Sequence, residues 1–521
     1  MMGMKEESSS EITHPAGDRA LVVGPIADGP VIVDTYLGRV KVDWDPEANV
    51  TALGHLAFFV EYLKSGGRLD ALVADCPLTY TSPNRPEVRN VLGTVMLGVL
   101  AGHWRYSHLT SLRGDTVSAE LLGMTKIQSE DSVRHGLEKI DETEGDRWLR
   151  RHLLETVSVL LSEKWILDCD TTIKPLYGHQ QGAVLGFNPH KPGRPSHAYH
   201  SFQISSPRLI LDVVVKPGNE SASKHSEPHI WTLLEQLPRT YWPALVRGDK
   251  DWGNERNMAR CEQEKLPYLF KLRLTKNVRR AAEKMAKGSG WVDAGKGWEG
   301  QETKLRLEGW SRSRRVILLR RLQADKSDKL ISTPQPDGTQ DLFWADPKTG
   351  AQVWEFAALV TSLDLEILTA AQLYRDRGDS ENPFDELKNQ WGWAGFTTFD
   401  IKRCQIMARM VALVYNWWSL YVRLADPDHH HEALTTRSLL LNAIARQTRH
   451  AGQTRLTITS NHGRREHVQR ALERISKFFK WLAQTAEQLT VPEKWTMILS
   501  QALKKYLRGR KLQPPPFVLP A

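Results

Sequence analysis

The order of the apolar segments between Lys164 and Leu274 constrains the fold more than any other feature of this chain. Three short segments rich in β-branched and aromatic residues come first: WILDCDTT, AYHSFQIS and RLILDVVV. Each has the length and composition of a strand. Beyond them, helical patterns alternate with two further apolar segments, ALVRGD and YLFKLRL. Strands that alternate with helices pack as a sheet with helices on its faces. The region therefore predicts a mixed α/β layer.

Aspartates stand at two of these predicted strands. Asp170 and Asp249 are each expected near the C-terminal end of a strand, which is the edge where open α/β sheets build their sites. Asp168 shares a face of its strand with Asp170, because side chains two residues apart point to the same side. Asp251 is a similar alternative to Asp249. The strand pattern alone leaves both choices open.

A third carboxylate lies in residues 373–391, LYRDRGDSENPFDELKNQW. Four residues of this stretch follow one another at steps of three, four and seven: Tyr374, Arg377, Glu381 and Lys388. On a helix of about four turns these steps keep the four side chains near one face. The simpler alternative is a solvated helix with surface ion pairs. Gly378 and Pro383 disfavour a regular helix and predict a kink or a restart near Glu381.

Asp170, Asp249 and Glu381 together predict a site for Mg²⁺ or Mn²⁺. The set contains no histidine or cysteine, and these cations prefer hard oxygen ligands. Two such ions, about 3.5–4 Å apart, can activate a water or a 3′-hydroxyl and stabilise the leaving oxygen of a phosphodiester. By contrast, we interpret the histidine-rich segment 428–432, DHHHE, as a solvated loop, since adjacent histidines on a helix cannot all face one ion.

The net charge of +9 is unevenly distributed. Residues 271–321 contain fifteen Lys and Arg against five Asp and Glu, and residues 401–521 contain twenty against seven. Two basic blocks on an otherwise acidic chain indicate a polyanionic partner, for which nucleic acid is the natural candidate. In the first block we expect three arginines to contact phosphates: Arg312, Arg314 and Arg315.

Patterns along the chain predict four regions. They are an N-terminal tail with short strands (RALVVGPI, GPVIVDTY and GRVKVDW) at 1–43, a helical DNA-binding domain at 44–163, the α/β domain at 164–400 with a β-rich insertion at about 275–350, and a basic helical region for dimerisation or DNA binding at 401–521. Within the second region, Ser118–Leu122 and Ser129–Ile140 have the outline of a helix-turn-helix. No apolar run reaches transmembrane length and the N-terminus lacks the apolar centre of a signal peptide, so we expect a cytoplasmic protein.

The order of Asp170 in LDCDTT, Asp249 in VRGDKDWG and Glu381 resembles that of the DDE transposases of bacterial insertion sequences. The spacing of Tyr374, Arg377, Glu381 and Lys388 is most similar to the YREK-signature group of these enzymes. Two longer segments share the likeness, PLYGHQQGAVLGFNP and YRDRGDSENPFDELK, and the resemblance covers about residues 85–450. Because the first aspartate of the family typically precedes a pair of threonines, the resemblance favours Asp170. Asp249 is similarly preferred over Asp251, and Glu381 over Asp379 and Glu386.

The resemblance implies a ribonuclease-H-like catalytic domain with a β-rich insertion before its glutamate helix, which agrees with the strand and helix pattern. It also implies cut-and-paste transposition with Mg²⁺, by a homodimer assembled on paired terminal inverted repeats and target DNA. Members of the group excise through a DNA hairpin at the transposon end, and Tyr374, Arg377 and Lys388 would hold the DNA strand. Two alternatives are a transposase-derived DNA-binding protein that no longer cuts, and a host metal-dependent nuclease on the same fold.

Hairpin formation bends a duplex end sharply, so a base near the cut must leave the stack at a cost of a few kcal/mol. Stacking on an aromatic side chain recovers roughly 1–3 kcal/mol. Trp298 lies in GKGWEG, the most loop-like setting among the tryptophans of the insertion. We expect Trp298 to stack on that base, and a position in the hydrophobic core is the alternative.

Overall fold

The computed structural model describes residues 29–188, 191–225, 227–323, 342–345, 353–485, 488–517 and 519. At a few positions inside helices and strands, residues 379–382 among them, only the backbone is described. The chain divides into two compact units, Met1–Ala48 and Asn49–Ala521.

In the first unit, β1 (Val31–Thr35) and β2 (Gly38–Val42) form an antiparallel hairpin, with Val33 paired to Val40. Both strands were expected from the sequence. A third predicted strand, RALVVGPI at 19–26, lies outside the described residues.

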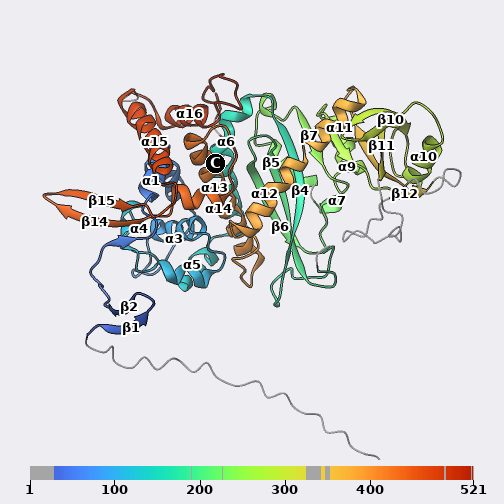
Figure 1. Ribbon diagram of the computed structural model, residues 1–521. Coiled ribbons are helices and arrows are strands. Elements are labelled where there is room, and N and C mark those ends of the chain that lie inside the picture. The colour runs from blue at the N-terminus through green and yellow to red at the C-terminus, as the bar shows by residue number, and fades with distance from the viewer. Residues whose placement is uncertain are drawn as a thin grey trace, which may run out of the picture. The chain divides into compact units, whose positions relative to one another are not determined.

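The second unit is built on a ten-stranded mixed sheet (Figure 1). Its first half contains the five predicted strands of the α/β region: β4 (Ile166–Pro175), β5 (Ser196–Ile204), β6 (Leu209–Pro217), β7 (Leu245–Gly248) and β8 (Tyr268–Lys271). They lie in the order β6-β5-β4-β7-β8. Neighbours among the first three are antiparallel, whereas β7 runs parallel to both β4 and β8. The predicted mixed α/β layer is therefore confirmed.

The β-rich insertion continues this same sheet. Its strands are β9 (Val292–Gly295), β10 (Trp298–Leu305), β11 (Arg314–Gln323), β12 (Leu342–Ala345) and β13 (Val353–Thr361). The two halves of the sheet join where β13 pairs antiparallel with β8, Leu359 lying opposite Lys271. The insertion begins with a helix, α10 (Lys276–Ala286), which the sequence interpretation did not anticipate. Further helices of the α/β region are α7 (Ala222–His225), α8 (Glu227–Leu234), α9 (Glu255–Gln263), α11 (Ile367–Arg375) and α12 (Gly378–Asn389).

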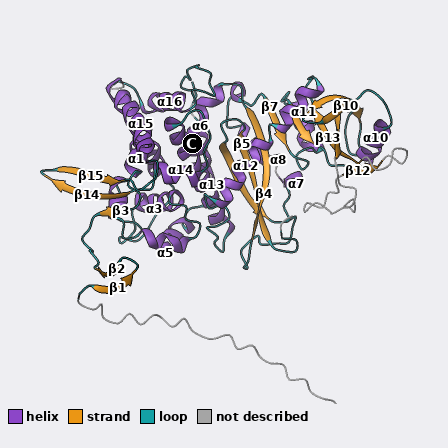
Figure 2. Ribbon diagram, viewed as in Figure 1, coloured by secondary structure: helices purple, strands orange, loops and turns teal. Residues whose placement is uncertain are grey.

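Helices from both ends of the chain pack around α13 (Ile401–Ala425) (Figure 2). Nearly all residues of α13 are buried, and these include the polar residues Gln405, Arg409 and Asn416. The N-terminal helices are α1 (Leu56–Ser65), α2 (Arg68–Ala74), α3 (Val88–Leu100), α4 (Thr116–Leu121), α5 (Glu130–Glu138) and α6 (Glu142–Val157). The C-terminal helices are α14 (Ala433–Leu440), α15 (Arg465–Thr485) and α16 (Val491–Ala502). Across the described ranges, no helix is both long and apolar enough to span a membrane.

The two helices of the helix-turn-helix candidate have different neighbours. Helix α4 packs against α1 and the short strand β3 (Val50–Thr51), whereas α5 packs against α3, α13 and the 3-10 helix Tyr106–Leu112. The charges on the exposed side of α5 nearly cancel, because Asp131 and Glu138 stand among Arg134 and Lys139.

Side chains of α13 satisfy the backbone of β6, the edge strand of the sheet. Asn416 accepts a hydrogen bond from Ile210 N at 2.8 Å and donates one to Ile210 O at 2.7 Å. Gln405 makes the same pair of contacts further along β6, where it accepts from Val215 N at 2.7 Å and donates to Val213 O at 2.8 Å. The unpaired backbone groups of an edge strand can form hydrogen bonds with a further strand. Asn416 and Gln405 bind these groups of β6 and so block such pairing on this side of the sheet.

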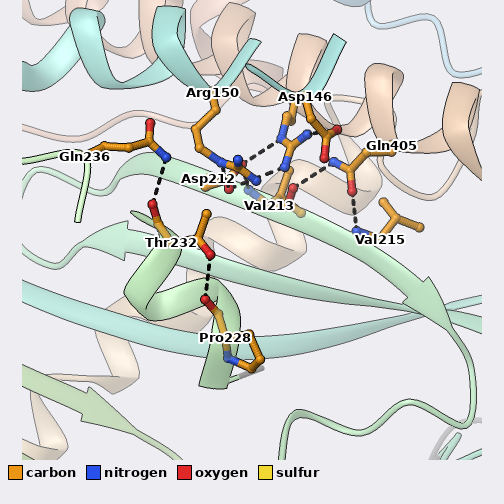
Figure 3. A network of polar contacts seen from close by, with 10 residues as sticks. Asp146, Arg150, Asp212, Val213, Val215, Pro228, Thr232, Gln236 and Gln405 are labelled. Atoms are coloured by element: carbon orange, nitrogen blue, oxygen red, sulfur yellow. Dashed lines mark hydrogen bonds and ion pairs between the residues drawn. The ribbon is translucent and has the colours of Figure 1, made fainter. Parts of the chain in front are cut away.

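A buried ion-pair network joins β6 to two helices at the same place (Figure 3). The Asp212 carboxylate on β6 accepts from Arg409 Nε of α13 at 2.7 Å and from Arg150 Nε of α6 at 2.8 Å. Arg409 also pairs with Asp146 of α6. Burial alone would raise the pKa of Asp212, but the two guanidinium groups lower it to about 2. The network fixes α6 and α13 on the sheet.

The basic C-terminal region is not entirely helical, contrary to the sequence interpretation. Residues 444–459 form an antiparallel hairpin of β14 (Ile444–His450) and β15 (Gln453–Thr459), and β14 also pairs with β3. The turn places Ala451 at φ 46° and Gly452 at φ 76°. Positive φ at both turn residues is the geometry that a two-residue hairpin turn requires.

Candidate active site

Asp170 and Asp249 lie side by side on adjacent parallel strands. Cys169 of β4 is paired with Gly248 of β7, and the two aspartates are the next residues of their strands. Asp170 was predicted at the end of its strand, but β4 continues to Pro175. The reason is that only its pairing with β7 ends at Cys169, while its pairing with β5 persists to Ser196.

Asp249 is presented by a tight turn directly after β7. A Cβ atom at Gly248 would lie 2.5 Å from the Trp252 side chain, so only glycine fits at this position. Trp252 N donates to Asp249 O at 3.1 Å, and Asp251 N donates to the Asp249 carboxylate at 2.9 Å. The Asp251 side chain instead pairs with Arg273. Of the two candidates, Asp249 is therefore the one held against β4.

The two carboxylates are close enough to influence each other electrostatically. Burial raises the pKa of Asp249 to about 6, and the neighbouring Asp170 carboxylate adds to this shift while Arg377 opposes it. Arg377 Nη2 lies 2.6 Å from Asp170 Oδ2, and its side chain is only 5% exposed. Burial would lower the pKa of Arg377, but Asp170, Tyr374 and Asp249 together raise it. A cation thus already partly compensates this carboxylate pair.

Asp168 has a different partner. Its two carboxylate oxygens accept from Arg247 Nε and Nη2, each at 2.7 Å, and both side chains are 1% exposed. Arg247 also donates to Ser205 Oγ and to the carbonyl oxygen of Leu373. The pair links β4, β7 and the end of α11. Asp168 is thus engaged in holding the sheet and α11 together.

The stretch predicted as one helix is two. Helix α11 ends at Arg375, and α12 begins at Gly378 with Arg377 as its N-cap, while Pro383 lies inside α12. Tyr374, in the last turn of α11, and Lys388, near the end of α12, both remain close to the site. Tyr374 acts electrostatically on Arg377, and Asp170 opposes the lowering of the Lys388 pKa that burial causes. The restart predicted from Gly378 is confirmed, whereas the continuous four-turn rod is wrong.

Glu381 lies on α12 between Arg377 and Lys388, but its side chain is outside the described part of the structure, as is that of Asp379. Glu386 has a structural role. It is 3% exposed and accepts hydrogen bonds from Trp391 Nε1 at 3.0 Å and from Ala433 N at the start of α14 at 3.0 Å. This leaves Glu381 and Asp379 as the candidates for the third carboxylate.

The three arginines expected at DNA differ in their surroundings. Arg314 is buried and forms ion pairs with Glu255 at 2.5 Å and Glu262 at 2.7 Å, so the expectation that it contacts phosphates is corrected. Arg315 pairs with Glu302 at 2.5 Å and donates to two backbone carbonyl groups. Arg312 is 64% exposed, with Glu262 at 3.2 Å. Arg312 is thus the best placed of the three to reach a ligand.

Trp298 begins β10 and is half-buried, with the guanidinium of Arg321 4.8 Å from the centre of its ring. It packs against the smaller hydrophobic core of this part of the sheet. Trp310, which lies in the same insertion, is 9% exposed. Trp298 is the more accessible of the two.

Residues 428–432 form a loop, as expected, yet two of the histidines do come together. The side chains of His429 and His431 both reach Asp426, at 3.4 Å and 2.9 Å. Their ligand atoms lie within 4.8 Å of one another, which is compact enough for these three residues to hold a metal ion. His430 faces the other way and contacts Glu386 at 3.1 Å.

The sequence interpretation missed Arg247 and the ribbon at 444–459. Arg247 directly precedes the Gly-Asp of the second motif, and its place on the same strand as Asp249 was the available signal. For the ribbon, the Ala-Gly between the segments IARQTRH and QTRLTIT was the signal.

A family model described as "Transposase DDE domain group 1" matches residues 68–479 of the chain. Among solved structures, the chain aligns with one described as "Cryo-EM structure of piggyBac transposase synaptic complex with hairpin DNA (SNHP)". The alignment has a TM-score of 0.37 and 11% sequence identity, and it covers 87% of this chain and 86% of that chain. No curated protein matches the sequence.

Proposed function

The chain belongs to the transposase DDE domain group 1 family, and from that premise we propose that it is a DNA transposase whose catalytic carboxylates are Asp170, Asp249 and Glu381. One observation carries the residue assignment. Asp170 and Asp249 are neighbours across two parallel strands, and Arg377 and Lys388 lie within electrostatic reach of Asp170. Carboxylates gathered with cations in this way suit phosphoryl chemistry, which depends on positioning and charge compensation.

The strand order β6-β5-β4-β7-β8, with three antiparallel strands followed by two parallel ones, supports a ribonuclease-H-like catalytic domain. In this proposal β4 and β7 present the two aspartates, and α12 presents Glu381. The insertion strands extend the sheet before α12, and the flanking helices form the remaining domains.

The donor set fits a divalent cation, for which Mg²⁺ is our proposal. Asp170 and Asp249 are oxygen ligands, and burial and mutual repulsion raise the pKa of Asp249 to about 6, so a further cation near the pair would be stabilising. When bound, such ions activate the attacking hydroxyl group and stabilise the leaving oxygen of a phosphodiester. The ligands in this proposal are Asp170, Asp249 and Glu381.

Residues of α11 and α12 would hold the DNA strand. Lys388 offers an ammonium group and Tyr374 a phenol for phosphate oxygens, and both stand beside the carboxylates rather than on a separate surface. Arg377 is paired with Asp170. Its guanidinium thereby limits the repulsion within the carboxylate pair and keeps the start of α12 against β4.

The finer assignment is to the YREK-signature transposases of bacterial insertion sequences. On this assignment a homodimer binds the two terminal inverted repeats, cuts each end through a hairpin, and joins the 3′-hydroxyls to target DNA. A protein that binds DNA without cutting and a host nuclease are the two alternatives.

The test uses the purified chain, Mg²⁺, and a supercoiled plasmid that carries the gene with its flanking DNA. We expect nicking by the wild-type chain and none by Asp170→Asn, Asp249→Asn or Glu381→Gln, whose gel shifts on the same DNA stay nearly unchanged. Asp376→Asn, an exposed carboxylate between α11 and α12, is the matched control and should nick normally. Gel shifts without any nicking by the wild-type chain would favour the protein that binds DNA without cutting. Nicking without strand joining would favour the host nuclease.

A further inference from the structure

The hairpin β14–β15 is a narrow ribbon whose two faces differ. Residues directly opposite each other on paired strands point to the same face. One face contains Ala445, Gln447 and Arg449 of β14, opposite Ile458, Leu456 and Thr454. Gln447 Nε2 donates to Glu120 of α4 at 3.0 Å, and Arg449 pairs with Glu120 at 2.5 Å. This inner face therefore contacts the helical part of the protein through Gln447 and Arg449.

Every residue of the other face is exposed. This outer face consists of Ile444, Arg446, Thr448 and His450 of β14 and Gln453, Arg455, Thr457 and Thr459 of β15. Seven of these eight side chains have groups that can donate or accept hydrogen bonds, and two are cationic. Figure 1 shows the two strands extending beyond α4 and α3, which lie near their base.

The formal charges within the ribbon and the chain segments next to it have one sign. Residues 433–465 contain six arginines and no Asp or Glu. The ribbon carries three of them, and Arg464 and Arg465 are exposed where the chain leaves β15. An exposed ribbon with one apolar residue on its outer face is a poor match for an apolar protein surface. It is a good match for a polyanion with hydrogen-bonding groups between its charges.

We propose that the outer face of β14–β15 binds duplex DNA, with Arg446 and Arg455 contacting phosphates or base edges. This inference rests on the proposed function and adds the element that binds the duplex. The helix-turn-helix candidate is a weaker choice, because the charges exposed on α5 nearly cancel.

The dimensions of the ribbon suit the major groove. That groove is about 12 Å wide and accepts a two-stranded ribbon, whose strands lie about 4.8 Å apart. Strands of seven residues span about 23 Å, or about seven base pairs at 3.4 Å per step. Arginine, glutamine, threonine and histidine all have hydrogen-bonding groups that match base edges or phosphates.

The ribbon is held at its base and along its inner face. Thr51 and Val50 of β3 pair with Ala445 and Arg446 at the base, and the contacts of Gln447 and Arg449 to Glu120 lie further toward the turn. An isolated two-stranded hairpin is only marginally stable, so these contacts are what hold the ribbon in position.

The experiment measures the fluorescence anisotropy of a labelled 40-base-pair duplex of mixed sequence, titrated with the full chain over a range of salt concentrations. Each lost phosphate contact should lower the slope of log affinity against log salt by about 0.9. We expect Arg446→Gln and Arg455→Gln each to weaken binding several-fold and to reduce this slope by about one. The double variant should lose roughly tenfold or more in affinity at moderate salt.

Arg449→Gln is the matched control, because it removes the same charge from the inner face of the same ribbon and leaves the pairing with β3 and the hydrogen bond from Gln447 to Glu120 in place. It should weaken binding less than either outer-face variant. In addition, a DNA-cleaving iron chelate attached to Thr448→Cys should cut the duplex, whereas the chelate on the inner face at Thr454→Cys should cut it poorly.

Equal effects of all three arginine variants, or equal cutting from both cysteines, would overturn the assignment of the outer face. A change in the oligomeric state of the outer-face variants with unchanged DNA affinity would identify the ribbon as a protein interface instead. These outcomes concern the ribbon alone. The proposed function is contradicted by a different result, in which the wild-type chain binds no DNA or does not cut it with Mg²⁺.

Discussion

Asp168 and Asp170 stand two residues apart on β4, and different cations hold them. Asp168 shares a buried two-pronged ion pair with Arg247, whereas Asp170 shares Arg377 with a second carboxylate, Asp249. Removing one member of a buried ion pair leaves the other charge uncompensated, which costs about 3–5 kcal/mol. Removing one of two repelling carboxylates relieves repulsion.

We therefore predict that Asp168→Asn lowers the free energy of unfolding by about 3–5 kcal/mol, while Asp170→Asn changes it little. Arg377 still faces Asp249 in the second variant. Urea denaturation followed by circular dichroism measures both effects. A larger loss in Asp170→Asn than in Asp168→Asn would contradict this division of roles.

Trp298 leads to a prediction on hairpin formation, the step that follows nicking of the first strand. If its half-buried ring stacks on an extruded base, Trp298→Ala should fold, nick the first strand at the wild-type rate and form few hairpins. An abasic nucleotide at the extruded position should partly restore the hairpin yield, because it has no base that must leave the stack. Denaturing gels resolve the nicked and hairpin products.

Trp310→Ala is the control for a core tryptophan, since Trp310 is 9% exposed. It should be destabilised by about 3–5 kcal/mol. A normal hairpin yield in Trp298→Ala would remove Trp298 from the mechanism, and a comparable loss of stability would assign it to the core.

At the scale of elements, sequence patterns predicted the buried strands of the sheet and the exposed hairpin β1–β2, whose strands are rich in valine, but they missed β14 and β15. Strands β5 and β6 are almost wholly buried, so their composition is dominated by the apolar and β-branched residues that signal a strand. Strands β14 and β15 are exposed on one face and along much of the other. With little burial there is little apolar alternation to detect. The side chain of Arg247 was missed for another reason, since an ion pair between strands depends on a register that one sequence does not provide.

The attachment of α6 and α13 to β6 leads to a prediction on pH. The pKa of Asp212 is about 2 in the folded chain, below its ordinary value of 3.8. A lowered folded-state pKa contributes stability that is fully present above the unfolded value and disappears as pH falls through the folded value. At neutral pH this contribution is roughly 2–3 kcal/mol, and it should vanish between about pH 4 and pH 2.

The measurement compares thermal unfolding of the wild-type chain and Asp212→Asn between pH 6 and pH 2. We expect the variant to be less stable at pH 6, because Arg409 and Arg150 lose their shared partner. We also expect it to lose less stability than the wild type below pH 4. Parallel pH profiles for the two proteins would show that other carboxylates determine acid unfolding.

At the scale of the whole molecule, the chain divides into two compact units at residue 48. We expect the main unit to fold without the residues before this boundary. Residues 1–48 form their own compact unit, in which β1 and β2 pair with each other. The next residues belong to the main unit. Thr51 Oγ1 donates to Asp115 at 2.6 Å, Ala443 N donates to Ala52 O at 3.1 Å, and Leu53 is buried.

Two truncations test this boundary. Deleting residues 1–48 should leave the unfolding temperature of the main unit unchanged. Deleting residues 1–53 removes β3, exposes the edge of β14 and leaves Asp115 without the Thr51 hydroxyl group, so the unfolding temperature should fall by several degrees. Because β3 holds the base of the ribbon, the longer deletion should also weaken binding to the 40-base-pair duplex. Scanning calorimetry and anisotropy measure the two effects. If both truncations unfold at the same temperature and bind DNA equally, β3 does not support the ribbon.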